Sequence, residues 1–180
     1  MNNTLCKQGF TLIELMVVVT VLGIVVAMGI PSFGTLIDNN RMSVMTNDLN
    51  STLQYARSEA VRRAGAVRVT AIDDDIGNGL RVWIDNGNNT YGDDGDIELR
   101  VLEVDAKQLA LAAKLADASA VKIDFSFNAR GENTLGATLV LGLCDDRKGN
   151  YGRRLELLAS GALRLAKDIS CNGDEETTSA

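Results

Sequence analysis

The sequence predicts an α+β fold in which a long N-terminal α-helix packs on an antiparallel β-sheet head. An apolar run occupies Leu12 to Ile30, apolar residues then recur at helical spacings up to Gly65, and the rest alternates with the period of strands. The 180 residues are enough for one domain with a hydrophobic core. We therefore expect one domain with a helical appendage.

The composition argues against several functional classes. The formal net charge is −6 and the pI is near 4.7, which disfavours general nucleic-acid binding, because such binding depends on Lys and Arg that neutralise phosphates. The chain has no histidine, so the commonest metal ligand and the commonest general base are missing. We expect no enzyme, no cofactor and no metal site.

The apolar run is long enough to cross a membrane. Between Leu12 and Ile30 the polar residues are Glu14 and Thr20, and a helix needs about 20 apolar residues to span a bilayer core. Lys7 precedes the run, so the N-terminus should stay in the cytoplasm and the head should be exported. A cleaved signal peptide and a plain signal anchor are alternatives. The plain anchor leaves Glu14 unexplained, since a carboxylate at the membrane centre costs about 2.5 to 3.5 kcal/mol.

Glu14 belongs to a longer motif, KQGFTLIEL, at residues 7–15. This stretch resembles the processing site of type IV pilins and type II secretion pseudopilins, a short basic leader that ends in Gly and is followed by Phe and a membrane-embedded Glu. The resemblance implies that prepilin peptidase cleaves between Gly9 and Phe10 and methylates the new Phe10 amine. It also implies that Glu14 pairs with the amine of a neighbouring subunit during filament assembly.

The three cysteines fit this cleavage. Cys6 would leave with the leader, and Cys144 and Cys171 would remain as an even pair in an oxidising compartment. We predict that they form a disulfide, which should stabilise the fold by roughly 3 to 4 kcal/mol. Two free buried thiols are the alternative.

Gly23 and Pro31 mark the weakest part of the helix. Pro31 lacks an N–H and clashes with the preceding turn, so it should bend or interrupt the helix. Related pilins lose helicity at comparable positions inside the filament, whereas a modest kink in an intact helix is the alternative for an isolated subunit. The predicted organisation is a leader at 1–9, a transmembrane or filament-core helix at 10–31, a periplasmic head at 32–172 and a flexible tail at 173–180.

The second part of the helix, residues 32–64, is amphipathic. Apolar residues three and four positions apart should share one face: Met42, Met45, Leu49, Leu53, Ala56, Ala60 and Ala64. Charged residues, including Glu59, fall largely elsewhere. The small side chains would let a sheet approach closely, and Gly65 is a suitable C-cap.

Strands are predicted after Gly65 at 67–72, 80–85, 97–104, 121–127, 138–144, 153–158 and 162–167, separated by Gly, Asn and Asp clusters. The stretch 105–119 stays open. Its Ala and Leu content favours a helix by propensity, whereas a strand or an irregular crossover would suit a sheet head better.

Several head segments, RVWID at 81–85, FSFNARG at 125–131 and LCDDR at 143–147, resemble the FimT/FimU and pseudopilin H group of the pilin superfamily. The paired cysteines favour a FimU-like minor pilin. The resemblance implies a structural subunit of a pilus priming or tip complex that supports pilus biogenesis and twitching motility, with a type II secretion pseudopilin as the alternative. It implies other pilins, prepilin peptidase and the inner-membrane assembly platform as partners. The chain would reside in the inner membrane before assembly and in the pilus afterwards.

Two further patterns could suggest ligands. The loop at 85–96 is rich in Asp and Asn, but it departs from the EF-hand pattern at three positions, so a solvated hairpin loop is the better interpretation. The acidic run Asp73–Asp75 is likewise best interpreted as a solvated turn.

Basic residues form two clusters, Arg62–Arg63 with Arg68 and Arg147–Lys148 with Arg153–Arg154. Some FimT relatives that bind DNA share a Gly-Arg-x-Arg near the C-terminus. The corresponding residues here are Gly161, Ala162, Leu163 and Arg164. The first Arg is missing, so DNA contact by Arg153, Arg154 or Arg164 is the less favoured interpretation, and DNA uptake in competence is a further alternative function.

Overall fold

The computed structural model describes residues 10–65, 67–117, 119 and 121–171, without the side chains of 28–32 and 168. The predicted leader, with Gly9, and the predicted tail at 173–180 lie outside these residues. The described elements are α1 (Leu12–Arg62), β1 (Val67–Ile72), β2 (Asp75–Ile84), β3 (Ile97–Glu103), β4 (Ala110–Leu115), β5 (Asp124–Phe127), β6 (Leu139–Cys144), β7 (Gly149–Leu157) and β8 (Leu163–Cys171).

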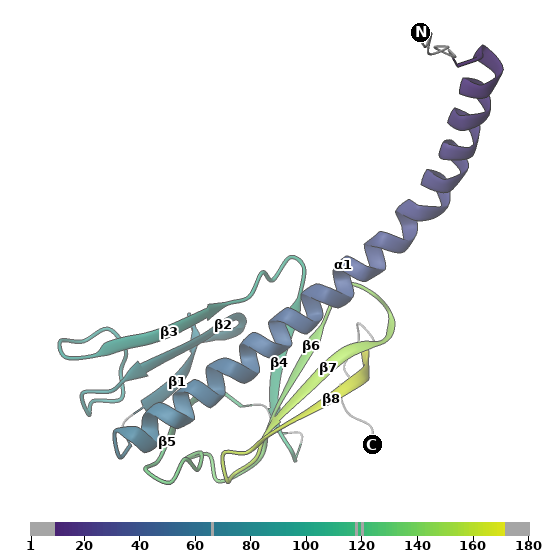
Figure 1. Ribbon diagram of the computed structural model, residues 1–180. Helices are drawn as coiled ribbons and strands as arrows, with labels where there is room; N and C mark the ends of the chain where they lie inside the picture. The colour runs from purple at the N-terminus through teal and green to yellow at the C-terminus, as the bar shows by residue number, and fades with distance from the viewer. Residues whose placement is uncertain (1–9, 66, 118, 120, 172–180) are drawn as a thin grey trace, which may run out of the picture. The chain divides into compact units, whose positions relative to one another are not determined.

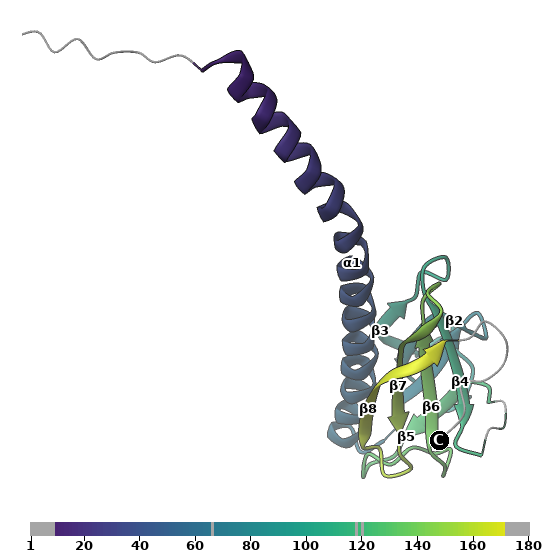
Figure 2. The same cartoon turned by 90° about the vertical axis from the view of Figure 1, so that its right-hand side faces the viewer.

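The chain separates into two compact units, with the boundary between Asn39 and Asn40. Within the described residues the first unit is formed by the start of α1. The second unit, the head, contains the rest of α1 and both sheets, and Figures 1 and 2 show this part of α1 running along them. The domain boundaries predicted at 9/10 and 31/32 stay predictions.

The head contains two four-stranded sheets among the described residues. Their strand orders are β3-β2-β1-β5 and β4-β6-β7-β8, and each pairing is antiparallel. The α+β class with a helix on antiparallel strands is confirmed, and the division into two sheets was not predicted.

The core lies between α1 and the sheets. Alternate residues of the strands are buried, such as Val67 and Val69 in β1 and Leu139 and Leu141 in β6. On α1, buried side chains follow the predicted stripe: Met42, Leu49, Leu53, Ala56 and Ala60, with Met45 half-buried. Ala56 and Ala60 are fully buried, so the small side chains do permit close packing.

The helix ends before the last residue of the predicted stripe. Its last residue is Arg62, and Ala64 and Gly65 have positive φ angles of 61° and 115°. The Gly65 N–H donates to the Ala60 carbonyl oxygen at 2.7 Å, which confirms Gly65 as a C-cap. Ala64 is exposed, so its predicted membership of the packed face is wrong, because the chain has already left the helix.

The ambiguous stretch at 105–119 contains strand β4. It pairs with β6 from Ala110↔Cys144 to Leu115↔Leu139, and Leu111 is buried. Pairing with a neighbouring strand therefore outweighs the helical propensity of Ala and Leu.

β2 begins five residues earlier than predicted, since Ile72 pairs with Asp75 around a tight turn in which Asp73 and Asp74 have positive φ angles.

A disulfide joins the ends of β6 and β8. Cys144 and Cys171 are bonded, with Cα atoms 5.7 Å apart and a sequence separation of 27. The predicted bridge is confirmed, and the alternative of two free thiols is wrong. The bond fixes the end of β8, where Cys171 also pairs with Gly149 of β7.

Candidate assembly site on the N-terminal helix

The helix begins at the polar residues of the N-terminal motif. Thr11 precedes the first helical residue, and its Oγ1 accepts a hydrogen bond from the backbone N–H of Glu14 at 3.3 Å. The Leu15 N–H donates to the Thr11 carbonyl oxygen at 3.2 Å. Thr followed three residues later by Glu is the capping-box pattern, and a carboxylate in the first turn also interacts favourably with the helix dipole. Glu14 thus has a local role that the sequence reasoning missed, although the spacing of Thr11 and Glu14 could have indicated it.

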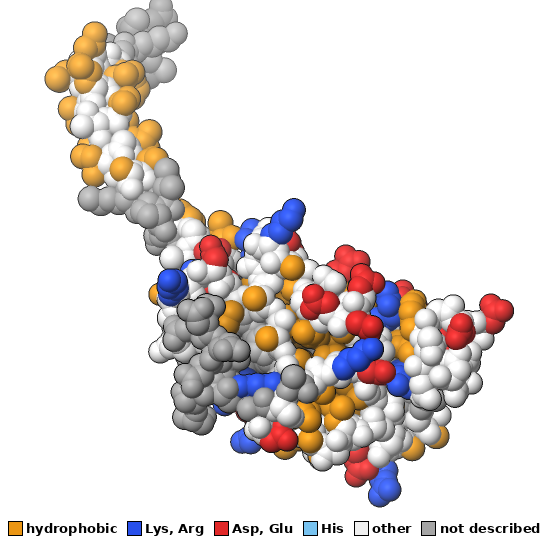
Figure 3. Space-filling model, turned by 180° about the vertical axis from the view of Figure 1, so that it is seen from behind, with side chains coloured by type: hydrophobic (Ala, Val, Ile, Leu, Met, Phe, Trp, Pro, Cys, Tyr) orange, Lys and Arg blue, Asp and Glu red, His pale blue; other side chains and the backbone are white. Residues whose placement is uncertain are grey.

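The side chains that follow form an apolar surface. From Phe10 to Val26 the large hydrophobic side chains are exposed, with exposed fractions from 84% at Phe10 to 47% at Val26. Figure 3 shows hydrophobic side chains along this part of α1, with no charged one visible on the face drawn. In the sequence, Glu14 is the one charged residue between Phe10 and Ala27. A continuous apolar surface of this kind marks a protein or membrane contact.

Among the described side chains, no helical segment combines the length and the apolar character needed to cross a bilayer.

Of the two predicted weak points of the helix, Gly23 has no packing role among the described residues. A Cβ added at Gly23 would meet no atom within 4 Å. The helical assignment of α1 continues through Gly23 and Pro31, in agreement with the alternative of an intact helix, while the Pro31 side chain lies outside the description. Loss of helicity in a filament stays a prediction.

The first basic cluster predicted from the sequence is divided between two carboxylate sites. Arg62 and Arg63 both donate hydrogen bonds to the carboxylate of Glu59. The bond from Arg63 Nε to Glu59 Oε1 is 2.6 Å long. The helical spacing places Glu59 off the apolar stripe, yet it is buried, with an exposed fraction of 7%. Hydrogen bonds from Arg62 and Arg63 lower the pKa of Glu59 from 4.5 to about 2.

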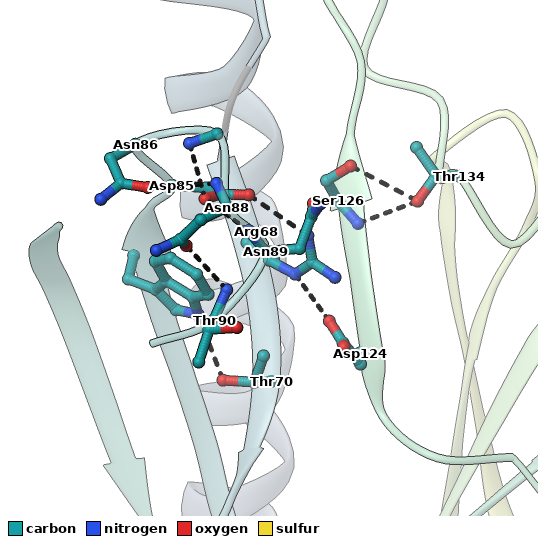
Figure 4. Close-up of polar contacts among 12 residues, drawn as sticks. Arg68, Thr70, Asp85, Asn86, Asn88, Asn89, Thr90, Asp124, Ser126 and Thr134 are labelled. Carbon is teal, nitrogen blue, oxygen red and sulfur yellow. Dashed lines mark hydrogen bonds and ion pairs between the residues drawn. The ribbon is translucent and has the colours of Figure 1, made fainter. Parts of the chain in front are cut away.

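Arg68 forms the second site. Its Nε donates to Asp124 Oδ1 at 2.7 Å, and its Nη1 donates to Asp85 Oδ2 at 3.2 Å and to Asn89 Oδ1. Figure 4 shows these side chains pointing toward one another from β1, β5 and the loop after β2. The hydrogen bond with Asp124 is the main cause that raises the pKa of Arg68. Sequence reasoning missed this cluster, because the partners of Arg68 lie 17 to 56 residues away from it in sequence.

The Asp-rich loop at 85–96 uses its carboxylates to hold its own backbone. Asp85 Oδ1 accepts hydrogen bonds from the N–H groups of Gly87 at 2.9 Å and Asn89 at 3.1 Å. Asp96 Oδ2 accepts from the N–H groups of Gly92 at 3.0 Å and Asp93 at 3.3 Å. These are turn-forming contacts. Within the described part of the chain, no group of three or more His, Cys, Asp or Glu residues could hold a metal ion.

Acidic residues interrupt the basic residues considered for DNA contact. The Nε of Arg154 lies 3.2 Å from Glu156 Oε1, and Glu156 pairs across the strands with Arg164. Arg153, in contrast, lies opposite a second basic residue, Lys167. Figure 3 likewise shows positive and negative side chains interleaved over the head. The arrangement does not form a continuous basic track, so it gives no added support to DNA contact.

Comparisons with known proteins agree on the family. The family model described as "Type II transport protein GspH" matches residues 45–161, and the model of the prokaryotic N-terminal methylation motif matches residues 5–30. Among curated proteins, none matches the chain significantly.

Two crystal structures of the type IV minor pilin FimU from Pseudomonas aeruginosa PAO1 are similar to this chain. The structure in space group P21 shares 27% sequence identity at a TM-score of 0.58, over 72% of this chain and 90% of that chain. The structure in space group P65 shares 29% identity at a TM-score of 0.54, over 71% and 94%. The helix packed on antiparallel sheets is therefore a type IV pilin fold of the FimU/GspH kind. The chain belongs to the GspH family within the type IV pilin superfamily.

Proposed function

We propose that this chain is a minor type IV pilin, a structural subunit that joins a priming or tip complex and supports pilus biogenesis and twitching motility. The observation that carries the proposal is the exposed apolar surface of α1, with the carboxylate of Glu14 in its first turn. Packing of this surface against the helices of like subunits would keep it out of water once the subunit has left the membrane, because exposing apolar surface to water is costly.

Processing would create the partner of Glu14. Cleavage between Gly9 and Phe10 exposes a cationic amine on Phe10, about one helical turn from Glu14. Between neighbouring subunits in an apolar filament core, this ammonium and the Glu14 carboxylate attract strongly, since a low dielectric strengthens their interaction. An unpaired carboxylate there would be costly, so the pair also selects the register of the incoming subunit.

The role proposed for the chain is association and needs no catalysis or cofactor. Its partners would be other pilins through helix 10–31, prepilin peptidase, and the inner-membrane assembly platform. Before assembly the chain would span the inner membrane once, with the N-terminus inside and the head in the periplasm. Afterwards it would be part of the filament.

A pseudopilin of a type II secretion system is the second candidate, favoured by the match to the GspH family model. The similarity to FimU favours the pilus instead. A deletion strain distinguishes the two. Loss of surface pili and surface motility would support the pilus role, and loss of hydrolase export with intact pili would support the secretion role.

Mass spectrometry of the mature N-terminus tests the proposal as a whole. We expect a chain that begins with methylated Phe10. An N-terminus created after Gly29, or an unprocessed Met1, would contradict it, because the helix or the new amine would then be missing.

A further inference from the structure

Trp83 is buried outside the main core. It is 0% exposed, yet it does not belong to the buried cluster around α1, whereas its neighbour Val82 does. Its indole N–H donates to Thr70 Oγ1 at 3.2 Å. The ring of Tyr91, from the loop at 85–96, contacts it edge-on at a centroid distance of 5.4 Å. Trp83 therefore belongs to a small satellite cluster beneath a loop.

The loop at 85–96 is held together largely by contacts within itself. Besides the bonds that Asp85 and Asp96 accept from backbone N–H groups, Asn86 Nδ2 donates to the Asp94 carbonyl oxygen at 2.9 Å. Asn88 Oδ1 accepts from the Thr90 N–H at 2.9 Å, and Asn88 Nδ2 donates to Asp93. These bonds can persist if the loop separates from the sheet, so the loop can move as a unit.

Two groups of side-chain contacts join the loop to the sheet. Tyr91 lies under the guanidinium of Arg81 at 4.1 Å, and its hydroxyl donates to Glu98 Oε2 at 2.6 Å. These contacts are exposed, with Tyr91 at 38% and the Glu98 side chain at 43%.

The other group of contacts is centred on Arg68, whose side chain is 16% exposed. Arg68 connects Asp85 and Asn89 of the loop to Asp124 of β5, and its guanidinium lies 6.0 Å from the centre of the Trp83 ring (Figure 4). Charge-assisted hydrogen bonds that are shielded from water are stronger than exposed ones. Arg68 thus provides the stronger connection.

We propose that Arg68 is a latch that holds the loop at 85–96 closed over Trp83. When the contacts of Arg68 are broken, the loop opens as one unit while the rest of the head stays folded. The separation of Trp83 from the core makes this local, because the buried side chains that pack on α1 are not disturbed. The latch does not depend on the role of Glu14 in filament assembly.

Trp83 reports directly on the latch, since it is the one tryptophan of the chain. The test compares the full chain in detergent micelles with the variant Arg68→Met and the control Arg130→Met, in which the replaced side chain is 84% exposed. We expect Arg68→Met to shift the Trp83 emission to the red and to raise its acrylamide quenching constant about twofold. Amide hydrogen exchange at 87–93 should accelerate roughly tenfold, with exchange in β6 and β7 unchanged. The control should behave like the unmodified chain.

Two results would overturn the latch. Trp83 in Arg68→Met could remain as protected as in the control, or β6 and β7 could lose protection together with the loop. If Arg68→Met does not fold, Arg68→Lys provides the test, because a single ammonium cannot hold Asp85, Asn89 and Asp124 at once. Arg68→Lys should show quenching above that of the unmodified chain, and equal quenching would refute the proposal.

Discussion

Arg57 of α1 donates a hydrogen bond from Nε to the carbonyl oxygen of Gly131 at 3.0 Å, and its Nη2 donates to the carbonyl oxygen of Ser160 at 3.3 Å. One side chain thus joins the helix to two turns that lie 74 and 103 residues further along the chain. We predict that Arg57→Met lowers the free energy of unfolding by about 1 to 2 kcal/mol, because both bonds involve a charged donor, but the bond to Gly131 is only part-buried and the bond to Ser160 is exposed. Thermal unfolding of the full chain in detergent, followed by circular dichroism, measures this loss. If Arg57→Met lost no more stability than Arg130→Met, the proposed role of Arg57 in joining α1 to the two turns would be contradicted.

Gly161 packs directly against the turn that contains Gly131. A Cβ at Gly161 would lie 1.8 Å from the Gly131 carbonyl oxygen, and its φ angle is +76°. We predict that Gly161→Ala destabilises the head by more than about 3 kcal/mol. Gly136→Ala is the matched control, since its φ is +66° but no atom lies within 4 Å of the added Cβ, so it should cost about 1 kcal/mol. Chemical denaturation of both variants gives the comparison, and equal losses would mean that the close contact is unimportant.

The disulfide between Cys144 and Cys171 should contribute strongly to stability. Replacing both with Ser is predicted to lower the free energy of unfolding by roughly 3 to 4 kcal/mol, mainly because the unfolded chain gains freedom. Denaturation with and without dithiothreitol checks that the loss of stability comes from the missing disulfide. The reductant should reproduce the loss in the unmodified chain and leave the double variant unchanged, and a loss below about 1 kcal/mol would contradict the prediction.

Glu59 makes stability depend on pH in a defined window. Since the pKa of Glu59 falls from 4.5 to about 2 in the folded chain, its contribution is complete above pH 4.5 and is lost as the pH falls toward 2. Glu59→Gln should therefore lower the melting temperature at pH 7, and the difference should shrink between pH 4.5 and 2. The exposed carboxylate of Glu103 provides the control variant Glu103→Gln. A difference that stays constant across this range would show that Glu59 does not titrate as described.

Local pattern predicted much of the backbone. β1 has the predicted bounds, and the helical spacing identified the buried stripe of α1 up to Ala60. Local pattern was insufficient where a distant partner decides the structure. It left 105–119 open between helix and strand, and residues 110–115 form β4 because β6 offers a pairing edge. The prediction that Ala64 belongs to the stripe was wrong, because the helix ends at Arg62.

The functional side chains also differ in how far the sequence could predict them. The N-terminal motif indicated Glu14, because its signal lies in adjacent residues. The Arg68 cluster could not be predicted, since side chains from β1, β5 and a loop meet only after the sheet has formed. The helical spacing placed Glu59 off the apolar stripe, but two arginines from the next turn allow its carboxylate to be buried.

Incorporation of a Glu14→Gln variant into filaments tests the central proposal most directly. Gln preserves the capping-box pattern with Thr11 but removes the negative charge. Asp38→Asn, which removes another carboxylate of α1, is the control. We expect Glu14→Gln to be inserted and cleaved normally, yet to fall roughly tenfold or more in the sheared filament fraction relative to the control, because no carboxylate remains to pair with the Phe10 amine. Normal incorporation of Glu14→Gln would contradict the account and leave Glu14 with its local role at the start of the helix.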